Sequence, residues 1–266
     1  MNNKEIILDA LIMTILLIFI VFPIGGLILW SFTQKWMWPS PFPQALGLKY
    51  WNLAAQVSLL EALWTGLKVA VIVTIATLIV SIPISYLLAR FKFPFKAIIL
   101  VLFLLPQAFP QLPVYANTAV FLYKLNLGGR IEGVILIQMV GALIYSVWTL
   151  TAVFQTIPTS LEEAAVNLGS TYTKAFFHIT FPLSVPGIIA SSILVFLWSL
   201  DEFTGTLLIG SPFVKTLSTF MYQAAQGYEL QVASVTAIIL MIPGILLLTL
   251  LEKHLKSEYL SKFGGI

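Results

Sequence analysis

The chain alternates between long stretches without a charged residue and shorter stretches that carry the charges. An α-helix needs about 20 apolar residues to cross roughly 30 Å of hydrocarbon. Six uncharged stretches reach that length: residues 10–34, 69–89, 97–123, 133–161, 175–200 and 230–251. None has the strict apolar–polar alternation of an outer-membrane strand. Because backbone polar groups in lipid must be satisfied within the segment, the pattern predicts helices that span a membrane.

We therefore expect an all-α membrane protein with six transmembrane helices, folded as one transmembrane domain over residues 1–266. Allowing for flanking residues, the spans are predicted at about 8–32, 62–89, 97–123, 133–156, 182–208 and 230–252, with a loop at 157–181. The first span could be mistaken for a secretory signal. It is longer than a typical signal core, Asp9 interrupts its start, and no small-residue cleavage site precedes Trp30. We expect it to be retained.

The third predicted span contains Pro106, Pro110 and Pro113, so it should be kinked or broken. A broken helix is tolerated in a membrane where it lines a cavity or packs inside protein. The prolines either serve a cavity or only shape the packing, and both interpretations stay open.

Composition agrees with a membrane environment. Of 266 residues, 59% are hydrophobic and 9% are charged, against roughly 25% charged in an ordinary soluble domain. The net charge of +3 is mild and no basic cluster is present, which argues against nucleic-acid binding. The absence of cysteine excludes disulfides, and two histidines make a poor basis for a metal site. We expect no metal or cofactor bound by this chain.

Lysine and arginine indicate the orientation, because cytoplasmic loops carry an excess of them. Eight lie on the side of the N-terminus: Lys4, Arg90, Lys92, Lys96, Lys174, Lys253, Lys256 and Lys262. Five lie on the other side: Lys35, Lys49, Lys124, Arg130 and Lys215. The excess predicts that both termini are cytoplasmic. Five tryptophans then gather at the outer face, where indoles favour the membrane interface: Trp30, Trp36, Trp38, Trp51 and Trp64.

The loop between the fourth and fifth spans predicts a short helix with its own start and stop signals. Thr159 or Ser160 can cap the start, with Glu162 or Glu163 completing a capping box. Gly169 stands where a C-terminal cap belongs.

One apolar stripe runs along this helix at positions i, i+3, i+4 and i+7: Leu161, Ala164, Ala165 and Leu168. A stripe of small apolar residues on the basic side of a membrane protein indicates a face that meets a partner. An amphipathic helix lying on the membrane surface is the alternative.

The spacing of the loop is more specific than its composition. Its residues in order are Glu163, Ala164, Ala165, Gly169, Ile179, Phe181 and Pro182, with three residues before the glycine and nine after it. This pattern resembles the EAA loop of binding-protein-dependent ABC importer permeases. That family ends the pattern in Ile-x-Leu-Pro, so Phe181 is a conservative departure. The resemblance extends over most of the chain and implies the transmembrane fold of a type I ABC importer.

The resemblance implies a transporter made of several chains with separate roles. In such permeases the loop is the coupling helix, which docks in a groove of the ATPase. Carried over residue by residue, the coupling positions are Glu163, Ala164, Ala165, Leu168 and Gly169. Glu163 could pair with a basic residue of the ATPase or merely cap its own helix. ATP and Mg belong to that partner, because no G-x-x-x-x-G-K-[ST] phosphate-binding loop occurs here. The chain is then no enzyme.

The further partners implied are a second permease, related but different in sequence, an extracytoplasmic substrate-binding protein and membrane lipid. The implied location is the bacterial cytoplasmic (inner) membrane, with several spans. Residues 213–226, in the last external loop, are predicted to form a short surface helix that could touch the binding protein.

Asp201 and Glu202 follow the apolar run of the fifth span, and residues 204–214 beyond them are again uncharged. Charge at membrane depth normally faces water or a partner. We therefore expect either acid to line the translocation path and attract a cationic or zwitterionic solute. Permeases for polyamines, iron, thiamine and aminophosphonates resemble this stretch best. A structural pair, or a place at the outer boundary of the membrane, is the alternative.

Two other function classes were weighed from the residues. An ion-coupled secondary transporter would need titratable residues within the spans, which the chain lacks apart from Asp201 and Glu202. An intramembrane enzyme would need a base beside one of the scattered serines, and no histidine or paired aspartate lies within the predicted spans. The predicted function is that of an importer permease forming half of a translocation pathway for a small solute.

Overall fold

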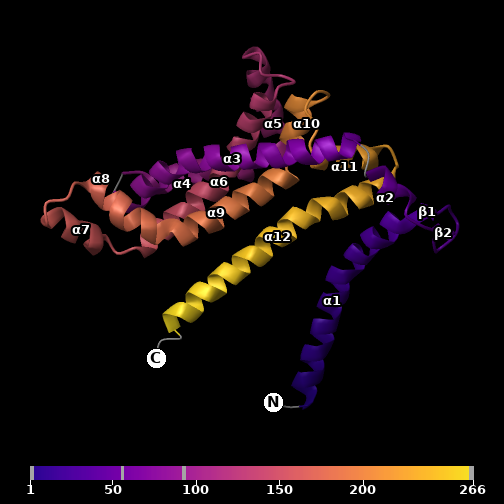
Figure 1. Ribbon diagram of the computed structural model, residues 1–266, viewed down its shortest axis with the longest axis horizontal. Coiled ribbons are helices and arrows are strands. Elements are labelled where there is room, and N and C mark those ends of the chain that lie inside the picture. Colours follow the sequence, from indigo (N-terminus) through magenta and orange to yellow (C-terminus); the bar gives the residue numbers. More distant parts are fainter. Residues whose placement is uncertain (1–2, 55–56, 92–93, 264–266) are drawn as a thin grey trace. The chain divides into compact units, whose positions relative to one another are not determined.

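The computed structural model describes residues 3–54, 57–91 and 94–263, whose regular elements are helices and one short hairpin (Figure 1). Lys92, one of the basic residues predicted on the cytoplasmic side, lies outside the described residues. The elements in order are α1 Asn3–Phe32, β1 Thr33–Lys35, β2 Ala45–Leu46, α2 Lys49–Ala54, α3 Val57–Arg90, α4 Lys96–Ala108, α5 Gln111–Lys124, α6 Ile131–Thr156, α7 Thr159–Asn167, α8 Tyr172–Ala175, the π-helix η1 Phe176–Thr180, α9 Phe181–Asp201, α10 Thr204–Gly210, α11 Leu217–Gln226 and α12 Leu230–Phe263.

Among the described residues, five helical segments are long and apolar enough to cross a membrane: Leu11–Phe32, Ser58–Arg90, Ile131–Thr156, Tyr172–Asp201 and Leu230–Thr249. Helices α4 and α5 form a sixth candidate as a pair bent by 99°. The all-α architecture with six spans is therefore confirmed when this pair is taken as one broken span.

The predicted break in the third span is also confirmed. Helix α4 ends at Ala108, and Pro110 stands at the N-cap of α5. Proline has no N–H and disfavours a helical conformation in the residue before it, and Phe109 is accordingly extended with ψ of 154°.

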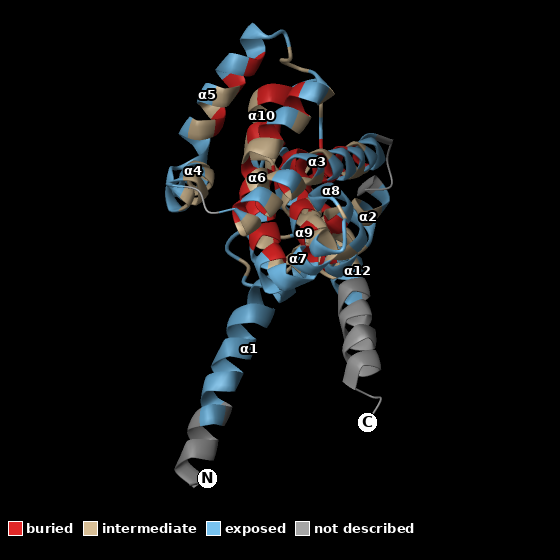
Figure 2. Ribbon diagram, turned by 90° about the vertical axis from the view of Figure 1, so that its left-hand side faces the viewer, coloured by how far each residue is buried: buried red, intermediate tan, exposed pale blue. Residues whose placement is uncertain are grey.

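The chain forms two compact units. The first comprises residues 1–62 and 220–242 and contains α1, the hairpin and α2. Residues 11–25 of α1 are exposed throughout, which Figure 2 shows as a continuous pale-blue helix. An apolar helix without protein burial is suited to a membrane environment.

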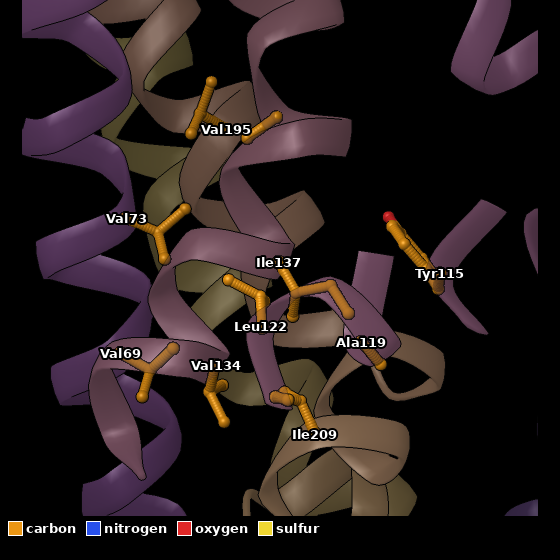
Figure 3. Close-up of a cluster of buried hydrophobic side chains, with 10 residues drawn as sticks. Val69, Val73, Tyr115, Ala119, Leu122, Val134, Ile137, Val195 and Ile209 are labelled. Atoms are coloured by element: carbon orange, nitrogen blue, oxygen red, sulfur yellow. The ribbon is translucent and has the colours of Figure 1, made fainter. Parts of the chain in front are cut away.

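The second unit comprises residues 63–219 and 243–266, and its core is built around α6, which packs against α9 and α10. Its main apolar cluster draws on five helices (Figure 3): Val69, Val73, Tyr115, Ala119, Leu122, Val134, Ile137, Ala142, Val195 and Ile209. A second cluster of Leu150, Phe154 and Ile157 lies at the other end of α6. Tyr86 of α3 and Phe176 of η1 pack against this second cluster.

Candidate functional site

Helix α7 is the predicted loop helix. Its C-terminal end agrees with the prediction, and its N-terminal end does not. It begins at Thr159 with Pro158 at the N-cap and no side-chain capping bond, so the predicted capping box is wrong. Proline sets a φ of about −65° that suits a helix start, and its observed φ is −60°. Neither Glu162 nor Glu163 bonds back to the start of the helix.

The C-terminus of α7 follows the prediction. Gly169 has a φ of +92°, in the left-handed region that glycine tolerates. Its N–H donates to Val166 O at 2.9 Å, and the Ser170 N–H donates to Ala165 O at 3.0 Å. These two bonds close a Schellman motif. The chain therefore leaves α7 sharply and enters α8 and η1.

Glu162 anchors α7 to the rest of the second unit. It is buried, and its Oε1 lies 2.8 Å from Nη2 of Arg90, the last residue of α3. The Arg90 Nε donates to the same oxygen at 2.9 Å. Tyr86 donates its hydroxyl to Oε2 at 2.9 Å, and Thr180 of η1 donates to Oε1. A buried carboxylate with a cation and two hydroxyl donors is fully satisfied.

Arg90 extends this arrangement to α6. Its Nη1 donates to the carbonyl oxygens of Phe154 and Ile157, each at 2.9 Å. Tyr86 packs edge-on against Phe154, with ring centroids 5.8 Å apart. We call Tyr86, Arg90, Glu162 and Thr180 the Arg90–Glu162 node. It joins α3, the end of α6, α7 and η1 at one buried point.

A neighbouring face of α7 is exposed. Leu161, Ala164 and Leu168 are exposed, and Leu168 keeps 90% of its accessible surface. Ala165 is half-buried, and open space surrounds the Cα of Gly169. The predicted stripe is therefore an apolar surface turned away from the second unit. Small residues there allow the backbone of another helix or strand to approach closely.

Glu163 lies between the two faces. It is exposed and lines a groove of about 410 Å³ together with Tyr86, Arg90, Phe91, Thr159, Glu162 and Tyr172. Its carboxylate is thus free to meet a group that enters the groove, in contrast to the buried Glu162. The loop pattern in the sequence indicates Glu163, whereas the structural role of Glu162 becomes visible only in the fold.

Asp201 and Glu202 also differ from each other. Asp201 ends α9 and is exposed, whereas Glu202 is buried. The Glu202 carboxylate accepts the N–H of Gly205 at 2.6 Å and that of Thr206 at 3.1 Å, at the start of α10. The Thr206 hydroxyl donates to it at 2.9 Å. Glu202 therefore caps α10.

A buried polar chain continues from this cap into α6. Gln138 donates its amide N–H to the Thr206 hydroxyl at 2.9 Å, and its carbonyl oxygen accepts from the Ser199 hydroxyl of α9. The Ser218 hydroxyl, in turn, donates to Glu202 O at 3.0 Å. These bonds hold Glu202 away from solvent and leave Asp201 as the exposed acid of the pair.

Among the described residues, no group of three or more His, Cys, Asp or Glu side chains could hold a metal ion.

Comparisons with known proteins identify the family. The sequence model of the family described as "Binding-protein-dependent transport system inner membrane component" matches residues 81–259. The maltose/maltodextrin transport system permease protein MalG of Escherichia coli K12 is 30% identical over 243 residues, covering 84% of this chain and 82% of the relative. The sulfoquinovosyl glycerol transport system permease protein SmoH of Agrobacterium fabrum is 29% identical over 198 residues, covering 73% and 70%.

Solved structures show the same fold. A bacterial ABC transporter involved in the import of the acidic polysaccharide alginate matches with a TM-score of 0.70 at 15% identity, over 95% of this chain and 98% of that chain. The MetNI methionine ABC transporter, in inward-facing conformations, matches with a TM-score of 0.57 at 17% identity, over 74% and 94%.

Proposed function

The chain belongs to the family of binding-protein-dependent transport system inner membrane components, and on that premise we propose that it forms half of a translocation pathway and couples ATPase movement to solute uptake. It is a multi-pass inner-membrane permease subunit of an ABC importer and not the ATPase. The ion-coupled secondary transporter weighed from the sequence is set aside, because this family depends on a binding protein. The proposal treats residues 1–266 as one permease domain.

In this proposal α7 is the helix that the ATPase binds. The observation that carries it is the two-sided construction of α7: Glu162 ties one face into the fold, while the other face is apolar and exposed. Ala164, Ala165 and Leu168 form the contact surface, with Gly169 fixing the turn that ends it. Glu163 pairs with a basic group of the ATPase. ATP and Mg are held by that partner.

The Arg90–Glu162 node then carries the movement of α7 into the spans. Helix α7 is joined covalently only to α6 and, through α8 and η1, to α9. The ion pair adds a direct link to the end of α3, which is 72 residues away in sequence. A docked α7 that shifts therefore moves three spans together. Such rigid coupling is how a small displacement is converted into alternating access.

This proposal places α7 and both termini on the cytoplasmic side. Because the chain has no cysteine, a single Glu163→Cys variant tests the sidedness directly. In intact cells an impermeant maleimide should leave this cysteine unlabelled, and it should react after the membrane is opened. Labelling from outside would place α7 beyond the reach of any cytoplasmic ATPase.

For the solute, we propose a small carbohydrate. The named relatives carry maltose or maltodextrin and sulfoquinovosyl glycerol, and a structural neighbour imports alginate. A polyamine or other cationic solute is the second candidate, and the exposed carboxylate of Asp201 favours it. Glu202 supports neither, since its carboxylate is used in capping α10.

The deciding experiment is co-purification of the chain with its ATPase, followed by uptake in proteoliposomes that contain the complete transporter. Ala164→Glu adds a charge to the exposed face of α7, and we expect it to abolish both ATPase retention and uptake. Gln155→Glu, which adds the same charge to an exposed position near the end of α6, is the matched control and should leave both unchanged. If Ala164→Glu retains the ATPase and full uptake, α7 is not the docking face.

A further inference from the structure

The hairpin that follows α1 is an ordered structure with an apolar tip. Strands β1 and β2 pair in antiparallel fashion. The Trp36 indole N–H donates to Ser40 O at 2.9 Å, and the Trp36 ring stacks on Trp30 of α1 with centroids 4.5 Å apart. Gln44 closes the loop by two hydrogen bonds to the backbone of Met37. We call residues 33–48 the aromatic hairpin.

The fold holds large apolar side chains of the aromatic hairpin outward. Trp38 keeps 95% of its accessible surface and Phe42 keeps 74%. Met37, Leu46 and Leu48 are also exposed. No charged residue occurs between Lys35 and Lys49, which flank the hairpin. An exposed apolar patch of this kind marks a binding surface.

The position of the patch in the chain identifies its partner. Helix α1 is a candidate membrane span up to Phe32, and β1 begins at the next residue. Trp38 lies six residues beyond the end of the span, which limits it to roughly 20 Å from that end at about 3.3 Å per residue. Tryptophan with flanking lysine is the composition of the membrane–water interface.

We propose that the aromatic hairpin is a lipid-contact surface, inserted into the headgroup region of the leaflet at the C-terminal end of α1. Trp38 and Phe42 enter the boundary with the acyl chains, and Lys35 and Lys49 lie at the level of the lipid phosphates. The hairpin thereby fixes the depth of α1, whose residues 11–25 are exposed to their surroundings. This inference does not depend on the docking role of α7.

A transient protein partner fits the patch less well. A binding protein that leaves after each delivery would return the patch to water in every cycle. Lipid covers it permanently.

The test uses the complete transporter in phosphatidylethanolamine–phosphatidylglycerol vesicles. Phe42→Cys keeps Trp38 in place and receives an environment-sensitive NBD fluorophore, and Lys35→Cys, on the exposed β1 strand, is the matched control. We expect the label at position 42 to emit at shorter wavelength than the control. It should be quenched by lipids with a nitroxide near the headgroup and protected from aqueous iodide.

Two outcomes would overturn the proposal. Iodide quenching of both labels to the same extent, with no effect of nitroxide lipids, would place the hairpin in water. A label at position 42 that leaves water only when purified binding protein is added would make the hairpin a protein-docking surface instead. Repeating the measurement with Trp38→Cys reports on the tip itself and must agree with the first position.

Discussion

Two pairs of adjacent acids, Glu162–Glu163 and Asp201–Glu202, each bury one carboxylate and expose the other. The buried members are satisfied in opposite ways. Glu162 meets groups distant in sequence, Arg90, Tyr86 and Thr180. Glu202 meets backbone N–H groups within four residues of itself. One acid is a tertiary cross-link between helices, and the other is a local cap.

The difference has a functional consequence. A cross-link transmits displacement between the elements that it joins, whereas a cap stabilises the start of one helix. The exposed acids differ accordingly: Glu163 lies beside a cross-linked helix that a partner can pull, and Asp201 lies beside a cap that holds α9 and α10 in place. Substitutions of single acids can test whether the two buried carboxylates have these different roles. The variants below are ordered from the largest expected loss of stability to the smallest.

The largest loss is expected for Glu162→Ala. Removing the carboxylate leaves the Arg90 guanidinium buried without its counter-charge, which costs about 3–5 kcal/mol for a buried pair. Thermal unfolding of the detergent-solubilised chain should show a marked fall in Tm. Glu163→Ala is the matched control and should stay within about 0.5 kcal/mol, as exposed substitutions do.

A double variant tests whether the pair acts as a unit. Arg90→Met with Glu162→Met removes both charges, so no charge is left buried alone. We expect it to be less destabilised than either single variant. Strictly additive losses would show that the two side chains do not interact. In proteoliposomes the double variant should hydrolyse ATP with reduced uptake, because the link from α7 to α3 is lost.

A smaller loss is expected for Glu202→Ala. The N–H groups of Gly205 and Thr206 lose their acceptor, and leaving a buried donor unsatisfied costs about 1–3 kcal/mol. The loss should be confined to α10, so hydrogen exchange should increase at residues 204–210 and remain unchanged in α7. Equal exchange increases in both helices would contradict a purely local cap.

Features of the fold that depend on residues close together in the sequence could be predicted, whereas those that depend on distant residues could not. The six uncharged stretches, the break at Pro110 and the Gly169 turn all depend on interactions within a few residues. The burial of Glu162 rather than Glu163 depends on where α3 ends relative to α7. Adjacent residues on a helix point about 100° apart, so only one acid can face Arg90, and the sequence does not say which.

The predicted capping box at the start of α7 was wrong for the same reason, because it also depends on a residue distant in sequence. Thr159 and Glu162 have the required spacing, but the Arg90 guanidinium competes for the carboxylate and gives it a charged partner. Arg90 itself follows an uncharged stretch, and in the sequence alone its charge indicates only the orientation of the chain. An arginine at the end of a span together with an acid in a loop helix is the signal that could have identified the node.

Gly169→Ala is expected to have a modest effect on stability and a larger one on coupling. Open space surrounds this position, so the cost comes from the left-handed backbone, at about 1–2 kcal/mol for a residue with a Cβ. If the Schellman turn orients α7 for docking, ATPase retention should fall more than Tm. Asn167→Ala, two residues before Gly169 and also exposed, is the control that keeps the glycine.

Asp201→Asn should change stability least, by less than about 0.5 kcal/mol, because the carboxylate is exposed. This variant distinguishes the two candidate solutes, a carbohydrate and a cation. If Asp201 attracts a cation on the path, the variant should lower uptake of spermidine by raising the apparent KM, with kcat and ATPase retention unchanged. Uptake of maltose should not respond, since a neutral sugar gains nothing from the charge. The two uptakes should be compared at low and high salt, because an exposed charge is screened within about 8 Å at 0.15 M. Loss of the same fraction of activity for both solutes would instead assign Asp201 to the packing at the end of α9.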